Sequence, residues 1–382
     1  MIKSKISILF VAGFYYPSQM GGPCNSFYWL AKALGQSNID VTVIAMSTGV
    51  LDKSIIFDEW IETDYGRVIY IKTKYTNYSI KYIISCIRKV KSVQLVHLNS
   101  IFSLASFIIG IITITFGKPI VWSPRGEFSS KALVYKQFLK KLMLSMIRRY
   151  SNRILFHTTS NIESNDTIAL FGNDSNLLEL PNYMELPSID VPDKSDYFLC
   201  IGRIHPIKGL ENLIYACSRS QFFRNSIYKL MIVGNSNNDY GLNLKNLVFK
   251  NKLTHKIIFI PHVSDIKVKN ELFQKAVFSF LPSYSENFGN VVVESLGNGT
   301  PVVASFGTPW QILEEYKAGF WVSNNPIELA NIIDKIILMS QHDLQSYFKN
   351  AKELAISKFD IKANVQKWVI SYQKLIITHE KD

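Results

Sequence analysis

Residues 282–305 read Pro-Ser-Tyr-Ser-Glu-Asn-Phe-Gly-Asn-Val-Val-Val-Glu-Ser-Leu-Gly-Asn-Gly-Thr-Pro-Val-Val-Ala-Ser, and this stretch decides the fold. It begins as a polar loop and continues in a short apolar run that predicts a helix. The helix should stop at Gly297 and Gly299, with Pro301 two residues further on. Residues 302–304 then predict a short buried strand. A loop, a short helix, a glycine stop and a strand in this order fit one α/β unit.

The same stretch carries two carboxylates near the predicted start of the helix. Glu286 lies in the loop, and Glu294 lies on the helix, a turn or more inward. The helix N-terminus offers backbone N–H groups that favour an anion, those of Phe288, Gly289, Asn290 and Val291. This combination suits a ligand with both a phosphate and a polyol. An ordinary helix with two solvated glutamates is the alternative.

A second pattern for binding a polyanion lies upstream. Residues 197–201 predict an apolar strand, and Gly-Arg-Ile-His-Pro-Ile-Lys-Gly follows at residues 202–209. Arg203 can hold a phosphate with two parallel N–H bonds, and Lys208 adds a point charge. The pattern is not a Walker loop, because Gly-x4-Gly-Lys-Ser/Thr is missing. A surface turn with two solvated cations is the alternative, but the simultaneous presence of Glu286 and Glu294 favours a binding site.

Together these residues resemble the retaining glycosyltransferases with the GT-B fold, the glycosyl transferases group 1 of the bacterial surface-polysaccharide type. The segment from Glu286 to Glu294 resembles the family's Glu-x7-Glu motif, and the segment with Arg203 and Lys208 resembles its Gly-Arg…Lys-Gly motif. The resemblance implies an α/β protein with two Rossmann-like domains facing each other across a cleft. It also implies that Glu286 meets the donor sugar, Glu294 holds the ribose, and both cations neutralise the donor diphosphate.

Further positions resemble donor contacts of this family. Gly21 and Gly22 precede a predicted helix in a loop that, by resemblance, touches the diphosphate and the acceptor. His262 and Val263 follow a predicted strand, where the backbone of family members meets the nucleobase. The likeness spans nearly the whole chain.

Two residues are candidates for the acceptor side. Arg125 lies in an Arg-Gly loop after a predicted strand, where family members carry His-Gly or Arg-Gly. His97 lies at a predicted strand end, and a purely structural histidine is the alternative reading there.

The chain length of 382 residues predicts two domains of about 180 residues each. Residues 1–183 should form a Rossmann-like acceptor-side domain, and residues 197–360 should form the nucleotide-sugar domain. Residues 184–196 predict the linker, because they contain prolines and no apolar period. Residues 361–382 predict an amphipathic helix, which in this fold packs back on the first domain.

The formal net charge of +12 is unevenly distributed. Residues 129–162 contain no acidic residue, and within them residues 131–153 predict a basic amphipathic helix. Such a helix can lie on an anionic membrane surface, and a partly buried helix with a solvated basic face is the alternative. Nucleic acid is a poor candidate, because no recognition motif accompanies the charge.

Three other features bear on location. The four cysteines are scattered, which indicates buried thiols in a reducing compartment rather than disulfides or a metal site. Residues 6–12 predict a first strand rather than a signal peptide, since no cleavage site follows. Residues 101–116 are apolar but shorter than the ~20 residues of a membrane span, so a buried helix is expected. We expect a cytoplasmic protein that is peripheral on the inner face of the cytoplasmic membrane.

We therefore expect a retaining hexosyltransferase that needs neither a metal nor another cofactor, since no Asp-x-Asp is present. It would move a hexose or N-acetylhexosamine from a nucleotide sugar (UDP-sugar first, GDP-sugar next) to a glycan or a polyprenyl-diphosphate-linked acceptor. Retention follows from the resemblance alone. Arg203 and Lys208 would stabilise the leaving diphosphate, and Glu286 would orient the sugar. A nucleotide-sugar epimerase of the same fold and an inactive scaffold are the alternatives.

Overall fold

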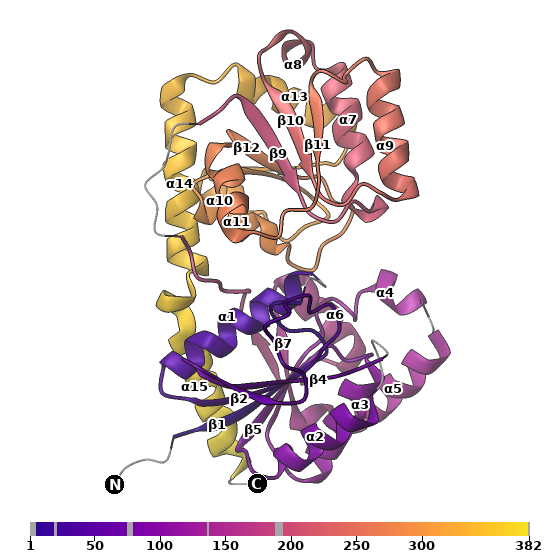
Figure 1. The fold of residues 1–382 in the computed structure, drawn as a ribbon, viewed down its shortest axis with the longest axis vertical. Coiled ribbons are helices and arrows are strands. Elements are labelled where there is room, and N and C mark those ends of the chain that lie inside the picture. The colour runs from indigo at the N-terminus through magenta and orange to yellow at the C-terminus, as the bar shows by residue number, and fades with distance from the viewer. Residues whose placement is uncertain (1–4, 19–20, 75–78, 136, 188–193, 381–382) are drawn as a thin grey trace. The chain divides into compact units, whose positions relative to one another are not determined.

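The computed structural model describes residues 5–18, 21–74, 79–135, 137–187 and 194–380. The chain divides into two compact units (Figure 1). Unit 1 consists of Met1–Glu185 and Ile361–Asp382, and unit 2 consists of Leu186–Asp360. Of the expected linker at 184–196, residues 188–193 lie outside the described part of the chain.

Unit 1 is built on an eight-stranded sheet with the order β3-β4-β2-β1-β5-β6-β7-β8. Neighbouring strands are parallel, except that β3 and β4 form an antiparallel hairpin. The strands are β1 (Ser7–Ala12), β2 (Asp40–Met46), β3 (Trp60–Thr63), β4 (Gly66–Ile71), β5 (Leu95–Asn99), β6 (Ile120–Ser123), β7 (Ile154–Thr158) and β8 (Leu177–Glu179). The predicted opening strands at 6–12 and 41–45 are confirmed as β1 and β2.

Helices cover both faces of this sheet, which explains why its central strands are apolar on both sides. One core contains residues of α1 and α15, and the other contains residues of α2, α3 and α5. The helical segments are α1 (Gly22–Gln36), α2 (Ile80–Val90), α3 (Leu104–Thr115), α4 (Ser130–Val134), α5 (Gln137–Arg149), the 3₁₀ turn η1 (Ser151–Arg153), α6 (Asn161–Phe171) and α15 (Ile361–His379).

The long apolar segment at 101–116 forms α3, and half of its residues are buried. None of the helices in the described ranges combines the length and the apolar character needed to cross a bilayer. All four cysteines are buried, as the sequence predicts, and no disulfide joins them in the described part of the chain.

The basic segment at 131–153 is not one helix, and this expectation is corrected. It forms α4, α5 and η1, and the chain is extended at Tyr135, between α4 and α5. The Lys140 ammonium group donates a hydrogen bond of 2.6 Å to the Ala132 carbonyl, which ties α5 back to α4. Periodicity did not reveal the break, because both helices continue the same basic and apolar composition.

Unit 2 contains a six-stranded, fully parallel sheet with the order β11-β10-β9-β12-β13-β14. Its strands are β9 (Tyr197–Ile201), β10 (Lys229–Val233), β11 (Ile257–Ile260), β12 (Phe278–Leu281), β13 (Val302–Ser305) and β14 (Gly319–Val322). Its helical segments are η2 (Pro206–Lys208), α7 (Leu210–Arg219), α8 (Gln221–Asn225), α9 (Asp239–Lys250), α10 (Ile266–Lys275), α11 (Asn290–Gly297), α12 (Ile312–Glu315), α13 (Pro326–Ile337) and α14 (Gln341–Phe359).

The strand order reverses at β9 in the centre of this sheet. The chain runs outward from β9 to β10 and β11, and it then returns to form β12 on the other side of β9. A reversal of strand order of this kind opens a crevice at the carboxyl ends of the central strands, where open parallel sheets bind ligands. The α/β class with two Rossmann-like parallel sheets agrees with the expectation from the sequence.

A chain of four hydrogen bonds crosses the interior of unit 1 and holds helix α15. Tyr372 Oη lies 2.7 Å from His97 Nδ1, and His97 Nε2 lies 2.8 Å from Ser123 Oγ. Ser123 Oγ lies 2.7 Å from His157 Nδ1, and His157 Nε2 lies 2.9 Å from the Leu180 carbonyl oxygen. Because the carbonyl can only accept, His157 Nε2 donates, and the donors then follow in one direction from Tyr372. Two neutral histidines satisfy every bond in this chain.

Burial keeps both histidines neutral. It holds the pKa of His97 well below its usual range, and the neighbouring His157 ring and Arg125 guanidinium act in the same direction. Burial, together with the charge of Arg125, lowers the pKa of His157 to about 3. Protonation of His157 at Nδ1 would turn a second donor toward Ser123 Oγ, which already accepts from His97 Nε2, and protonation of His97 at Nδ1 would turn a donor toward the Tyr372 hydroxyl that donates to it.

We expect the free energy of unfolding to fall as the pH drops below about 6.5, the usual histidine pKa. Between that pH and about 3, the unfolded chain binds a proton at His157 that the folded chain does not bind. Stability therefore decreases toward acid, by up to about 1.4 kcal/mol per pH unit for each such histidine. Urea unfolding across this pH window measures the slope. His157→Gln should make the slope shallower, whereas His342→Gln, at an exposed histidine, should leave it unchanged. Equal slopes in wild type and His157→Gln would contradict the assignment.

Candidate functional site

The candidate site of unit 2 is built from two loops at neighbouring strand ends. Residues 202–209 follow β9, and residues 282–289 follow β12. Strands β9 and β12 are parallel neighbours, with Phe198 opposite Phe278. The two loops therefore leave the sheet side by side, although they lie far apart in the sequence.

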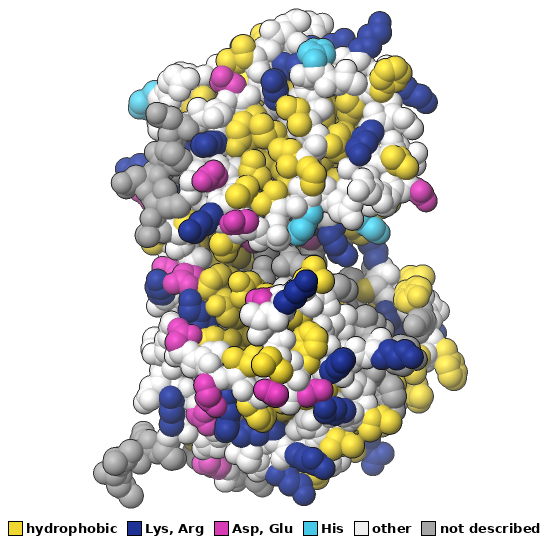
Figure 2. Space-filling model, in the orientation of Figure 1, with side chains coloured by type: hydrophobic (Ala, Val, Ile, Leu, Met, Phe, Trp, Pro, Cys, Tyr) yellow, Lys and Arg dark blue, Asp and Glu magenta, His cyan; other side chains and the backbone are white. Residues whose placement is uncertain are grey.

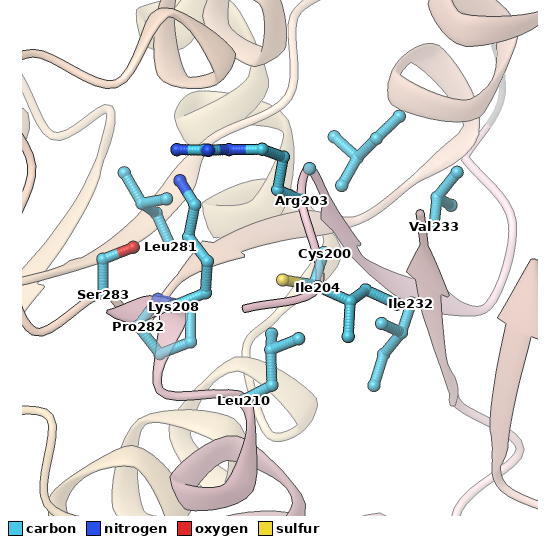
Figure 3. Close-up of a pocket in the computed structure, with 12 residues that line it drawn as sticks. Cys200, Arg203, Ile204, Lys208, Leu210, Ile232, Val233, Leu281, Pro282 and Ser283 are labelled. Carbon is cyan, nitrogen blue, oxygen red and sulfur yellow. The ribbon is translucent and has the colours of Figure 1, made fainter. Parts of the chain in front are cut away.

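A pocket lies between these loops and the ends of the central strands (Figure 3). Arg203 and Lys208 line it, and their nitrogen-bearing ends lie on the same side of the pocket. The empty space of this hollow, which is open to solvent, amounts to about 270 Å³. The remaining lining residues are Cys200, Ile201, Gly202, Ile204, Leu210, Ile232, Val233, Leu281, Pro282 and Ser283.

The two cations of the site are held differently. Lys208 is paired with the Glu286 carboxylate, and the two side chains are only 17% and 16% exposed. Arg203 is exposed and makes no hydrogen bond or ion pair with any described residue. One cation is thus fixed in place while the other is available to an anionic ligand.

The Glu286 carboxylate is fixed through one of its two oxygens. Oε1 accepts from Lys208 Nζ and from Ser283 Oγ, the latter at 2.8 Å. The Glu286 N–H donates to the Gly307 carbonyl at 2.9 Å. Oε2 accepts no hydrogen bond from the described residues, so it is free to accept one from a ligand hydroxyl.

A glycine allows the two loops to touch. Gly209 has a φ of 59°, in the left-handed region, and it precedes the first turn of α7. A Cβ atom at Gly209 would overlap the Pro282 carbonyl and the Asn324 side chain. The loops are also joined by a backbone hydrogen bond of 2.8 Å from the Tyr284 N–H to the Ile207 carbonyl.

A polar network beside the pocket ties the second loop to α7, and sequence reasoning did not find it. The Glu211 carboxylate accepts from the Tyr284 hydroxyl at 2.9 Å and from the Tyr240 hydroxyl. Asn212 Nδ2 donates to Tyr284 Oη at 3.0 Å and to the Asn324 carbonyl at 2.8 Å. The only signal in the sequence was an acidic residue in the first turn of α7, which the helix dipole explains as well.

The helix after Glu286, which was expected to start with the N–H groups of residues 288–291, starts later than residue 288. Helix α11 begins at Asn290, and Gly289 precedes it with a φ of 84°. Phe288 is buried against Trp310, whose indole N–H donates to the Phe288 carbonyl. Phe288 thus anchors the loop through packing, while Val291 is partly buried.

Glu294 lies on α11 and meets a partner that the sequence did not indicate. Lys269 Nζ on α10 lies 2.6 Å from Glu294 Oε2. Glu294 Oε1 has no hydrogen-bond partner among the described residues, so this oxygen remains available.

His262, which is exposed, and Val263 follow β11 at the edge of the sheet. Strand β10 separates them from the loop that carries Arg203.

In unit 1, the predicted residues Gly21, Gly22 and Arg125 lie at the carboxyl ends of the parallel strands. Gly21 has a φ of 111°, and α1 begins at Gly22. Arg125 has a φ of 56° and donates to Asn99 Oδ1 at 2.8 Å and to Asn182 Oδ1 at 2.7 Å. Burial lowers the pKa of Arg125 to about 10, and the guanidinium lines a small pocket that includes His157 and Trp368.

His97 does not have the place that an acceptor contact requires. It lies in the middle of β5, its side chain is fully buried, and both ring nitrogens are hydrogen-bonded within unit 1. Without exposed surface it cannot touch an acceptor, and the structural alternative holds. A histidine within a short apolar run was a weak signal, because the same pattern fits a strand interior.

The sequence of unit 2 is similar to that of known glycosyltransferases. Residues 185–354 match the sequence profile of the family Glycosyl transferases group 1, a range that covers most of unit 2. An uncharacterized glycosyltransferase of Methanocaldococcus jannaschii is 31% identical over 192 residues, which are 49% of this chain and 47% of that protein. The O-antigen chain mannosyltransferase of Salmonella typhimurium is 27% identical over 177 residues, 45% of this chain and 46% of that protein. The match spans about half the length of these curated relatives.

A structural comparison covers nearly the whole chain. The Anabaena protein HepE, solved in complex with UDP and glucose, superposes with a TM-score of 0.74 at 18% identity. The superposition covers 97% of this chain and 100% of that chain. At this identity the likeness concerns the fold. The chain therefore has the GT-B fold, and its residues 185–354 match the family Glycosyl transferases group 1.

Proposed function

We propose that this protein is a nucleotide-sugar glycosyltransferase that works with retention and without a metal. It transfers a hexose or N-acetylhexosamine to a glycan or a polyprenyl-diphosphate-linked acceptor. The observation that carries the proposal is that Arg203 and Lys208 line one pocket at the point where the strand order reverses, with Glu286 ion-paired to Lys208. Glycosyl transfer needs both a site for the departing diphosphate and a polar group for the sugar.

The charges of the pocket favour a diphosphate. Arg203 and Lys208 contribute two positive charges and Glu286 one negative charge, so the three groups together carry +1. Arg203 binds the diphosphate with its unpaired guanidinium, and Lys208 adds a charge whose position the ion pair fixes. As the bond to the anomeric carbon breaks, these fixed cations stabilise the negative charge that grows on the leaving phosphate.

Glu286 serves the sugar through its free oxygen. Oε1 is occupied by Lys208 and Ser283, so Oε2 accepts a hydrogen bond from a sugar hydroxyl and orients the ring. No role as a nucleophile is assigned to Glu286, because its carboxylate is held by the cation that also faces the phosphates. The leaving phosphate then acts as the base for the acceptor hydroxyl on the same face.

The nucleoside is placed by unit 2. The free Oε1 of Glu294 suits the ribose hydroxyls, and the backbone near His262 and Val263 meets the base. UDP is the favoured nucleotide, with GDP next, and the likeness to the UDP complex of HepE supports this order.

Unit 1 provides the acceptor side, with Gly21, Gly22 and Arg125 at its strand ends. Surface-polysaccharide synthesis, such as that of O-antigen or lipopolysaccharide, is the proposed pathway, and the similarity to a Salmonella O-antigen mannosyltransferase supports it. We place the enzyme in the cytoplasm, peripheral on the inner face of the membrane, because its basic segment at 131–153 suits anionic lipid.

Thermal unfolding with added nucleotides tests the donor site. We expect UDP or a UDP-sugar to raise the midpoint by about 5–10 °C at saturating concentration, because a ligand that binds only the folded state stabilises it. Arg203→Ala and Glu294→Ala should each lose most of this shift. Arg219→Ala, at an exposed cation at the far end of α7, should keep it. No shift with UDP, GDP, ADP or their sugars would refute the glycosyltransferase assignment and favour an inactive scaffold. Conversion of the donor sugar to its epimer without an acceptor would favour the epimerase.

Substitutions at the ion pair between Lys208 and Glu286 distinguish its contribution to stability from its contribution to catalysis. Glu286→Ala leaves the largely buried Lys208 unpaired, so we expect a loss of about 3 kcal/mol in the free energy of unfolding. Glu286→Leu combined with Lys208→Met removes both charges and should recover most of that loss. Transfer activity should stay at least about a hundredfold below wild type in both variants. Urea unfolding and turnover assays measure the two effects. Wild-type turnover in the double variant would rule out a catalytic role for the pair.

The network at Glu211 should set the position of the loop that carries Glu286. Tyr284→Phe removes the hydroxyl that joins Glu211 and Asn212. We expect turnover to fall by about tenfold to a hundredfold through misplacement of Glu286, with a stability loss of only about 1 kcal/mol. Tyr215→Phe, at an exposed tyrosine on α7, the helix that carries Glu211 and Asn212, is the matched control and should behave as wild type. Unchanged turnover in Tyr284→Phe would show that the backbone contacts alone hold the loop.

A further inference from the structure

Helix α5 has an apolar stripe that its packing in unit 1 does not use. One face of the helix is buried in the core through Met143, Leu144 and Ile147. A second set of large apolar side chains on the same helix is exposed. This set, called the apolar ridge below, consists of Phe138, 86% exposed, Leu142, 55%, Leu139, 47%, and Met146, 41%.

The ridge is continuous along the helix. Phe138, Leu142 and Met146 follow one another at intervals of four residues, so they lie on one side, and Leu139 lies beside them. The ridge spans about 12 Å at 1.5 Å per residue. Single exposed apolar residues are ordinary, but a contiguous exposed stripe indicates a surface that another structure covers.

Unpaired cations flank the ridge. Lys141, Arg149 and Arg153 are exposed and form no ion pair with any described residue, and residues 129–162 contain no acidic side chain. Figure 2 shows hydrophobic and basic side chains gathered together on the edge of unit 1 formed by α4 and α5. The partner that covers this surface is therefore apolar in part and negatively charged in part.

We propose that the apolar ridge inserts into the interface of an anionic lipid bilayer. Phenylalanine, leucine and methionine side chains enter among the lipid chains, and the flanking lysine and arginine side chains reach the lipid phosphates. Each such cation near an anionic membrane adds to the attraction. The ridge is one helix wide and has no hydrogen-bonding group of its own, which fits a fluid surface better than a specific protein groove.

The structure separates the apolar residues of the basic segment at 131–153 that can meet the lipid from those that are buried in unit 1. Met143, Leu144 and Ile147 are excluded, because they are buried in unit 1. Phe138 is the most exposed of the ridge side chains and acts as the main anchor. The biological role of this membrane contact rests on the proposed function, since a polyprenyl-diphosphate-linked acceptor is reached at such a surface. The vesicle experiment below does not depend on the proposed function.

Co-sedimentation of the full chain with vesicles tests the proposal. We expect binding to vesicles of mixed phosphatidylglycerol and phosphatidylcholine and much weaker binding to pure phosphatidylcholine. The double substitution Phe138→Ser with Leu142→Ser should lower binding by about tenfold or more, because both side chains lose apolar burial in the bilayer. Lys141→Gln with Arg149→Gln should weaken binding and remove most of its dependence on salt.

Phe249→Ser is the matched control, since Phe249 is 73% exposed on α9 of unit 2. It should bind vesicles as wild type does. The thermal shift with UDP should be unchanged in the ridge variant, so a missing shift concerns the donor site and a missing vesicle interaction concerns the ridge. Equal vesicle binding by wild type and ridge variant would overturn the proposal. So would a wild type that ignores vesicles but self-associates in sedimentation velocity through the ridge, which would make the ridge a contact between copies.

Discussion

The ion pair between Lys208 and Glu286 is the interaction on which the candidate site depends. It joins two loops that are adjacent only because β9 and β12 are neighbours at the centre of a parallel sheet. Neither charge would be stable alone at this degree of burial, since a largely buried charge without a partner is costly. The pair therefore imposes the relative position of the loops, and the close contact at Gly209 is what allows that position.

Among the charged groups of the site, some have a hydrogen-bond or ion-pair partner in the described part of the chain and others do not. Lys208 and one oxygen of Glu286 are committed to each other, whereas Arg203 and the other Glu286 oxygen have no partner among the described residues. Glu294 repeats this arrangement, with one oxygen on Lys269 and one without a hydrogen bond. Each carboxylate is thus fixed by a lysine and keeps one acceptor for a ligand. Such preorganisation lowers the cost of ordering the site when a ligand arrives.

Unit 1 uses buried polar groups for a different purpose. The chain from Tyr372 through His97, Ser123 and His157 satisfies its donors and acceptors internally, so it fixes α15 to the sheet and leaves nothing for a ligand. A fully connected network of this kind specifies one packing arrangement, because any displaced member leaves a buried polar atom without a partner. The ridge on α5 is the opposite case, an exposed apolar surface beside cations that form no ion pair within the described part of the chain.

The sequence by itself determined much of the local structure and the residue types of the two loops after β9 and β12. Apolar runs predicted the strands, glycine and proline predicted where the helix after Glu286 ends, and two charge patterns selected Arg203, Lys208, Glu286 and Glu294 as a candidate binding site. These features are readable because strand burial, turns and phosphate binding each need particular residue types at short range.

Only the tertiary structure decided which groups meet. Lys269 reaches Glu294, and Glu211 reaches Tyr284, across helices and loops whose adjacency follows from strand order rather than from spacing along the chain. The same reason explains the two errors. His97 has the composition of a strand-end histidine but becomes part of the core, and the basic segment breaks into α4 and α5, where a lysine of one helix bonds a carbonyl of the other. Periodicity reports which face of an element is apolar, whereas the contacts between elements depend on how the sheet orders them.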